Sequence, residues 1–246
     1  MTEPAEPQAP ARRVAYDAAE LRREDRLKEA LLAERGGRAA VNQLRSLRTS
    51  GFLARGGERD PVVLMHTTSG QAFLRVFADA GDRTIGLDRG IPWKTEPGED
   101  GQPGTAEVSH EEEVLLKVFG QVHGPLLPRL MGGTAVIRSV ETSGGESGAV
   151  IRVTFSCREN PRLEEVDLDP ATLNVLRWHF KCGKGHTVVA HYRDHRTVNE
   201  ISHPFSAEVW RSRKKIAELE VETLEPNFGA FDLLFRNPFA VQPVNR

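Results

Sequence analysis

The sequence lacks any apolar run of the roughly 18–20 residues that a membrane-spanning helix needs. Its first ten residues, Met1 to Pro10, have neither the basic start nor the apolar core of a secretion signal. Two origins stay open: a cytoplasmic protein, or a protein whose signal has been removed. We expect a protein that does not span the bilayer in either case.

Sequence motifs of the common enzyme classes are also missing. There is no Gly-x-Ser-x-Gly, no phosphate-binding glycine loop and no His-Glu-x-x-His. The acidic run Glu111-Glu112-Glu113 is typical of the first turn of a helix, where it interacts favourably with the helix dipole. We therefore expect no catalytic residues, no cofactor and no enzymatic activity.

The chain also has no excess of positive charge. Its 33 basic and 35 acidic residues give a net charge of −2, which excludes the basic footprint of a nucleic-acid-binding protein. The best metal-ligand candidates are His179, His186, His191 and His195. Alternation along a strand puts His191 and His195 on one face and His186 on the other, so we predict no metal site.

Cysteine is scarce, with only Cys157 and Cys182 in the chain. Both are expected on the apolar face at the same rim of a sheet, which allows a disulfide in an oxidising compartment. The predicted strand 163–167 separates them, however. Two strand spacings come to about 9.6 Å, against the roughly 7 Å that a disulfide allows between Cα atoms. Two buried free thiols are the alternative.

What the sequence does contain divides it into two parts. Residues 1–15 are rich in Pro, Ala and Glu and predict a disordered linker, and residues 16–240 predict a single domain. Apolar residues at helical spacing predict helices over Asp17–Glu34, Arg38–Leu44 and His110–Val122. A capping box, Ser109 and Glu112, precedes the third helix.

Short apolar segments separated by turn residues predict strands over the rest of the domain. The short links favour antiparallel neighbours, and strands interrupted by helices make an α+β fold. The glycine- and proline-rich segment 97–104 predicts a mobile loop. We expect eleven strands: Leu47–Arg55, Pro61–Thr67, Phe73–Ala78, Thr84–Asp88, Thr134–Glu141, Ala149–Cys157, Leu163–Asp167, Asn174–Cys182, His186–Arg193, Pro204–Arg211 and Lys214–Thr223.

Five segments, spread through residues 25–239, resemble the outer-membrane lipoprotein-sorting superfamily, the carriers and receptors similar to LolA and LolB. Each motif is short, and their order along the chain carries the resemblance. It implies a half-open antiparallel β-barrel of about eleven strands, with helices covering the concave face. The segments are Gly36–Leu53, Gly90–Pro97 (GIPWKTEP), Val166–Arg177 (VDLDPATLNVLR), His191–Asn227 and Phe231–Pro238 (FDLLFRNP).

Strand alternation and this resemblance together predict a hydrophobic cavity for acyl chains. A dry, non-directional surface suits hydrocarbon, because each buried methylene contributes about 0.8 kcal/mol. The predicted lid lies within residues 97–131 and contains Val114, Leu115, Val118, Phe119, Leu126 and Leu127. The predicted lipid-binding wall consists of Ile151, Val153, Phe155, Leu176, Trp178, Phe180, Val209, Leu219 and Val221.

The resemblance also implies a place and partners for the protein. We expect a monomeric lipid or lipoprotein carrier or receptor in the periplasm, or at the periplasmic face of the outer membrane, peripheral or anchored. Its partners would be acyl chains and other envelope proteins. The alternative is a non-enzymatic protein-interaction or regulatory module on the same scaffold, with a filled core.

Overall fold

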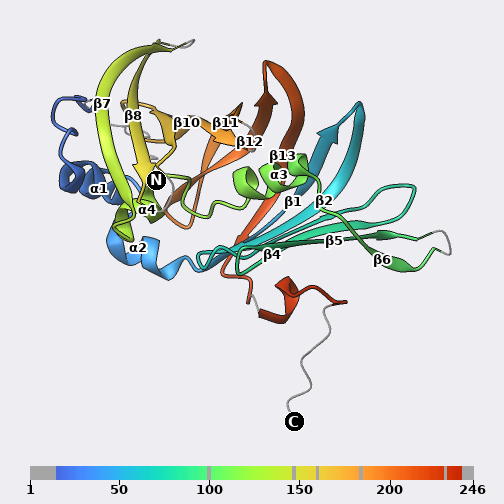
Figure 1. Ribbon diagram of the computed structural model, residues 1–246. Helices are drawn as coiled ribbons and strands as arrows, with labels where there is room; N and C mark the ends of the chain where they lie inside the picture. The colour runs from blue at the N-terminus through green and yellow to red at the C-terminus, as the bar shows by residue number, and fades with distance from the viewer. Residues whose placement is uncertain are drawn as a thin grey trace, which may run out of the picture.

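The computed structural model describes residues 15–98, 101–145, 148–158, 161–182, 185–229 and 232–239. All but the last residue of the predicted linker 1–15 lies outside these ranges. Thirteen strands form one antiparallel sheet (Figure 1). They are β1 (Ser46–Arg55), β2 (Glu58–Thr67), β3 (Ala72–Val76), β4 (Arg83–Asp88), β5 (Ile91–Pro97), β6 (Pro103–Ala106), β7 (Ala135–Gly145), β8 (Gly148–Cys157), β9 (Leu163–Leu168), β10 (Val175–Cys182), β11 (His186–Val198), β12 (Ile201–Arg211) and β13 (Lys214–Pro226).

The sheet consists of two meanders that meet in its middle. The strand order is β6-β5-β4-β3-β2-β1-β13-β12-β11-β10-β9-β8-β7, so the first strand pairs with the last. Strands β6 and β7 form the two edges, and the helical segment that connects them crosses the hollow of the sheet. The expected open antiparallel sheet with helices on its concave face is confirmed.

Two of the thirteen strands, β5 and β6, were not expected, and the prediction of eleven is wrong by these two. Prolines conceal both strands, because Pro92 and Pro97 lie in β5 and Pro103 begins β6. Proline cannot donate to a ladder and is tolerated near a sheet edge. The segment 97–104, expected as a loop, is in part a hairpin in which Pro97 pairs with Pro103.

The helices are α1 (Glu24–Ala33), α2 (Gly37–Gln43), α3 (His110–Phe119) and α4 (Leu127–Met131), with a 3-10 turn η1 (Asp232–Phe235). Helix α1 is shorter than expected, because the Asp17 side chain accepts from the amide of Ala19 and holds that segment in a turn. None of the helices in the described part of the chain is long and apolar enough to cross a bilayer.

Helix α3 begins at the predicted capping box, in which Ser109 Oγ accepts from the Glu112 amide and the Glu112 carboxylate accepts from the Ser109 amide. It ends at Gly120, earlier than the predicted Val122. Figure 1 shows α3 in the hollow of the sheet, with α1, α2 and α4 grouped near β7 and β8. One apolar core joins these helices to the concave face of the sheet.

Most of the predicted wall and lid residues belong to this core. Leu176 is the exception, because β10 has a bulge between Val175 and Arg177 that moves Val175 into the core and leaves Leu176 half-buried. The core members from the two predicted sets are Ile151, Val153, Phe155, Trp178, Phe180, Val209, Leu219, Val114, Leu115, Val118, Phe119, Leu126 and Leu127, and Val221 packs against them.

Candidate functional site

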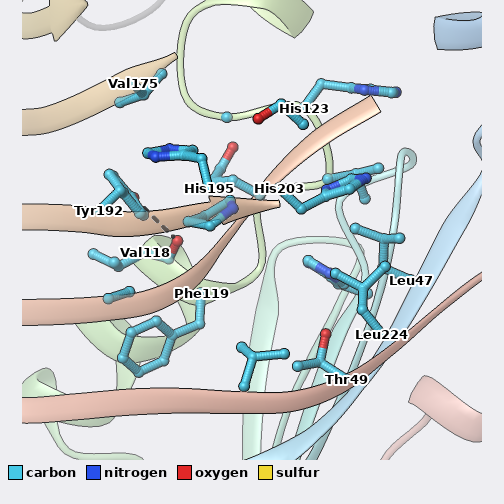
Figure 2. A pocket seen from close by; sticks show the side chains of 18 of the residues that line it. Leu47, Thr49, Val118, Phe119, His123, Val175, Tyr192, His195, His203 and Leu224 are labelled. Carbon is cyan, nitrogen blue, oxygen red and sulfur yellow. Dashed lines mark hydrogen bonds between the residues drawn. The ribbon is translucent and has the colours of Figure 1, made fainter. Parts of the chain in front are cut away.

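A cavity of about 80 Å³ lies where the C-terminal end of α3 meets the concave face of the sheet (Figure 2). It is bordered by the strands near the centre of the sheet, by the segment 121–125 that follows α3, and by Arg35 after α1. Its apolar lining includes Leu47, Leu64, Val118, Phe119, Val122, Val175, Ala207, Leu219, Val221 and Leu224.

Few of the predicted wall and lid residues line this cavity: Leu219 and Val221 from β13, and Val118 and Phe119 from α3. The others fill the core between α3, α4 and strands β8 to β10. Trp178 is fully buried there, and its indole N–H donates to Glu164 Oε2 at 2.8 Å. Arg129 binds the same carboxylate oxygen at 2.6 Å. Contact of these residues with an acyl chain stays a prediction.

The cavity also has a polar side that the sequence analysis missed. Arg35 lines it together with His66 on β2, His123 after α3, His195 on β11 and His203 on β12. Figure 2 shows His123, His195 and His203 on one side of the space, with Phe119 and Thr49 on the other. Strand alternation predicts two of these positions, because His66 follows Val62 and Leu64 on the buried face and His203 lies between the buried Ile201 and Phe205.

Several ring nitrogens on this side have no hydrogen-bond partner within the described part of the chain. They are both nitrogens of His66, both of His123, and Nε2 of His203. Buried polar atoms without partners are uncommon in folded proteins, since each costs about 1–3 kcal/mol. The cavity therefore has an excess of hydrogen-bonding groups over partners.

Burial keeps these histidines neutral. It lowers the pKa of His66 to about 4, and the nearby His123 adds to the effect. Burial and then the charge of Arg35 lower the pKa of His123 to about 4, although the carbonyls of Leu44 and Val41 oppose this. The pKa of His203 is also about 4, through burial and the surrounding basic groups. Burial lowers the pKa of His195 as well.

Arg35 is the permanent charge of the cavity and is only 7% exposed. Its Nη1 donates to the carbonyl oxygen of Leu31 at 3.3 Å, near the C-terminal end of α1, where a cation is favoured. No described carboxylate lies within 4 Å of its guanidinium. Burial lowers the pKa of Arg35 to about 10, which still leaves it charged at neutral pH.

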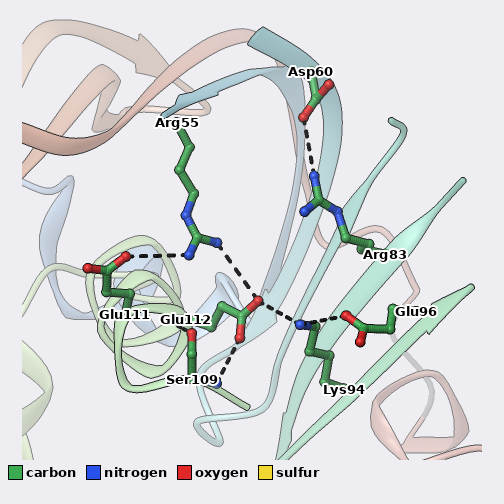
Figure 3. Close-up of polar contacts among 8 residues, drawn as sticks. All are labelled: Arg55, Asp60, Arg83, Lys94, Glu96, Ser109, Glu111 and Glu112. Atoms are coloured by element: carbon green, nitrogen blue, oxygen red, sulfur yellow. Dashed lines mark hydrogen bonds and ion pairs between the residues drawn. The ribbon is translucent and has the colours of Figure 1, made fainter. Parts of the chain in front are cut away.

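The other end of α3 is held by ion pairs to three strands (Figure 3). Glu111 pairs with Arg211 of β12 at 2.6 Å and with Arg55 of β1 at 3.4 Å. Glu112 pairs with Lys94 of β5 at 3.2 Å. Burial alone would raise the pKa of Glu112, but the hydrogen bonds with Ser109 and the Lys94 charge outweigh it, and the pKa is lowered.

Both cysteines are free thiols in the structure, so the disulfide alternative is not formed. Strand β9 separates their strands, as the sequence predicts. The Cys182 sulfur lies 3.1 Å from His110 Nε2 at the start of α3. Among the described residues, no three His, Cys, Asp or Glu side chains are arranged to hold a metal ion.

No family model and no curated protein matches this sequence. Solved structures do. A DUF1329 family protein from Desulfovibrio piger matches with a TM-score of 0.53 at 10% sequence identity, covering 85% of this chain and 95% of that one. A LolA superfamily protein from Nitrosomonas europaea matches with a TM-score of 0.53 at 9% identity, covering 85% of this chain and 97% of its own. The chain has the fold of these proteins, a LolA-like open sheet curved around helices.

Proposed function

We propose that this protein is a non-enzymatic carrier or receptor of the cell envelope that binds the acyl chain of a lipid or lipoprotein between α3 and the concave face of the sheet. The observation that carries the proposal is the cavity under the end of α3, bordered by apolar residues of α3 and β13. The LolA-like fold supports the same function and a periplasmic location.

The cavity does not hold a whole acyl chain as it stands. A cavity of about 150 Å³ takes up one benzene molecule, and this one is about 80 Å³. Binding therefore requires α3 to move away from the sheet. The apolar face of α3, which includes Val114, Leu115 and Val118, makes non-directional contacts that hydrocarbon can replace at little net cost.

A second candidate is a protein-interaction module that keeps its core closed. The filled region around Phe155, Trp178 and Phe180 favours it, because Glu164 and Arg129 hold that region by directional bonds. The two candidates differ in whether the hollow ever opens to a hydrophobic ligand.

Substitution of Ala207 separates the candidates. Ala207 of β12 lines the cavity, so Ala207→Leu fills the space that an acyl chain would enter. A carrier loses affinity for a fluorescent fatty acid in this variant, while Ala149→Leu, at an exposed position on β8, binds like the parent. Lipid in organic extracts of the purified parent would support the carrier. A parent that carries no lipid and binds no probe would support the interaction module.

A further inference from the structure

The basic cluster at the cavity, which we define as Arg35, His123, His195 and His203, has no role in holding hydrocarbon. We propose that it binds the anionic group, a carboxylate or a phosphate, of the ligand whose chain lies between α3 and the sheet. This inference rests on the proposed function and adds the chemical class of the ligand: an amphiphile with a negatively charged end.

The charge balance around the cluster favours an anion. Three carboxylates lie near enough to influence it, and each is already engaged. Glu34 accepts from Tyr16 Oη at 2.9 Å, Asp169 accepts from the amides of Ala171 and Thr172, and Asp194 pairs with Arg196 at 2.6 Å. A buried guanidinium without an ionic partner is costly, and a ligand anion would supply that partner.

The histidines add donors that match the same ligand. A neutral imidazole carries one N–H, and the partner-less nitrogens of His123 and Nε2 of His203 border the same cavity as Arg35. The charge of Arg35 contributes to the lowered pKa of His123, His195 and His203, which places all three within its field. The two or three oxygens of a carboxylate or phosphate accept from several such donors at once, in charge-assisted bonds.

Size and surroundings agree with this assignment. At roughly 10–15 Å³ per water, a cavity of about 80 Å³ has room for one small anionic group. Partly exposed polar residues, including Gln121, Asn174 and Ser202, also border it, whereas Phe119, Leu219 and Val221 form an apolar border where a chain can continue. A cation would be repelled by Arg35, and a neutral amphiphile would leave the guanidinium unpaired.

The test compares oleate with oleyl alcohol, which share a chain and differ in charge. We expect the full-length parent to bind oleate more tightly by about tenfold to a hundredfold, the range for a hydrogen bond to a charged group. Arg35→Gln should remove this preference, lowering affinity for oleate and leaving oleyl alcohol unchanged. The matched control is Arg38→Gln, which removes the same charge from an exposed residue of α2 paired with Glu29.

Three results have distinct meanings. Equal binding of the two ligands by the parent, unaffected by Arg35→Gln, would overturn the anion site and leave the carrier function intact. Binding of neither ligand would overturn the carrier function, and the site would then be tested with inorganic phosphate by NMR of the histidine rings. Saturable shifts of His123 and His203 that vanish in Arg35→Gln would support a site for a free anion, and their absence would overturn it.

Discussion

The clearest mark of the cavity at the scale of single residues is His66, which is buried on β2 with neither ring nitrogen hydrogen-bonded to the described chain. Leu47 and Leu64 line the same cavity. An apolar side chain at position 66 would fit this surface and remove the unpaired nitrogens. The imidazole is therefore retained at a cost in stability.

We predict that His66→Leu raises the free energy of unfolding by about 1–2 kcal/mol, because it removes the desolvation penalty of an unpaired polar group. Urea unfolding monitored by tryptophan fluorescence measures the change. His186→Leu, at an exposed position on β11, is the control and should give no gain. A loss of stability in His66→Leu would mean that the imidazole has a partner in solution.

Arg35 allows a similar comparison. If the guanidinium serves a ligand, Arg35→Gln should leave the free energy of unfolding unchanged or raise it by about 1 kcal/mol, because a buried charge without an ionic partner is removed and glutamine can still donate to the Leu31 carbonyl. Thermal unfolding without ligand measures this. A drop of about 2 kcal/mol or more would instead indicate a structural role at the end of α1.

Individual burial was largely predictable where a regular pattern exists. Alternation predicted Ile151, Val153 and Phe155 correctly, and the same rule applied to His66 would have found a cavity residue. Leu176 was wrong, because a bulge changes which side chains face the core. A bulge depends on how neighbouring strands pair, which the local sequence does not show.

At the scale of elements, α3 is the part whose two ends differ most. Its first turn has Glu111 and Glu112 in ion pairs with three strands, whereas near its last turn the Val118 carbonyl accepts from Tyr192 Oη at 3.3 Å. The cavity lies at the second end. We therefore expect α3 to open from its C-terminal end and to remain tethered at its start.

Glu112 is the centre of this tether, since it caps the helix and binds Lys94, and its side chain is only 6% exposed. We predict that Glu112→Gln lowers the free energy of unfolding by about 1–3 kcal/mol and increases amide exchange in α3 more than in β11 and β12. Hydrogen exchange with mass spectrometry measures the second effect. Glu107→Gln, exposed before the helix, should do neither; equal exchange in α3 of both variants would contradict the tether.

Elements were predictable in type and less so in extent. The capping box identified the start of α3 to the residue, because its hydrogen bonds are local. The strands β5 and β6 were missed because proline argues against a strand, and only their place near the sheet edge makes it acceptable. That place is a property of the assembled sheet.

At the scale of the whole molecule, the sheet is closed in its middle by a pairing that no local pattern predicts. Strand β1 pairs with β13, with Leu47 opposite Pro226 and Leu53 opposite Leu219. The order of the short motifs, through their resemblance to the lipoprotein-sorting superfamily, supplied the overall arrangement. The cavity depends on this pairing, because Leu47 and Leu219 both line it.

The same convergence makes the stability of the whole domain depend on pH. His66, His123 and His203 have folded-state pKa values of about 4, against 6.5 for the free side chain, chiefly because they are buried. The charged groups that influence them include Arg35, with His195 close by. Since the folded pKa values are depressed, the unfolded chain binds protons first as the pH falls.

The sign and the window follow from this. The stability contribution is fully present above pH 6.5 and is lost as the pH falls from about 6.5 to about 4. Around pH 5, three protons taken up on unfolding give a slope of roughly 4 kcal/mol per pH unit. The carboxylates with lowered pKa, such as Glu112, contribute at lower pH, from about 4.5 downward.

We therefore predict that the free energy of unfolding falls steeply between pH 6.5 and pH 4.5, and that His66→Leu reduces the slope by about a third by removing one of the three groups. Urea titrations at half-unit steps measure both slopes, with His186→Leu as the control that keeps the parent's slope. A bound anion would oppose this loss, because protonated histidines hold it more tightly. A parent whose stability is flat over this window would show that the three histidines are already hydrogen-bonded or exposed, and the basic cluster would lose its buried character.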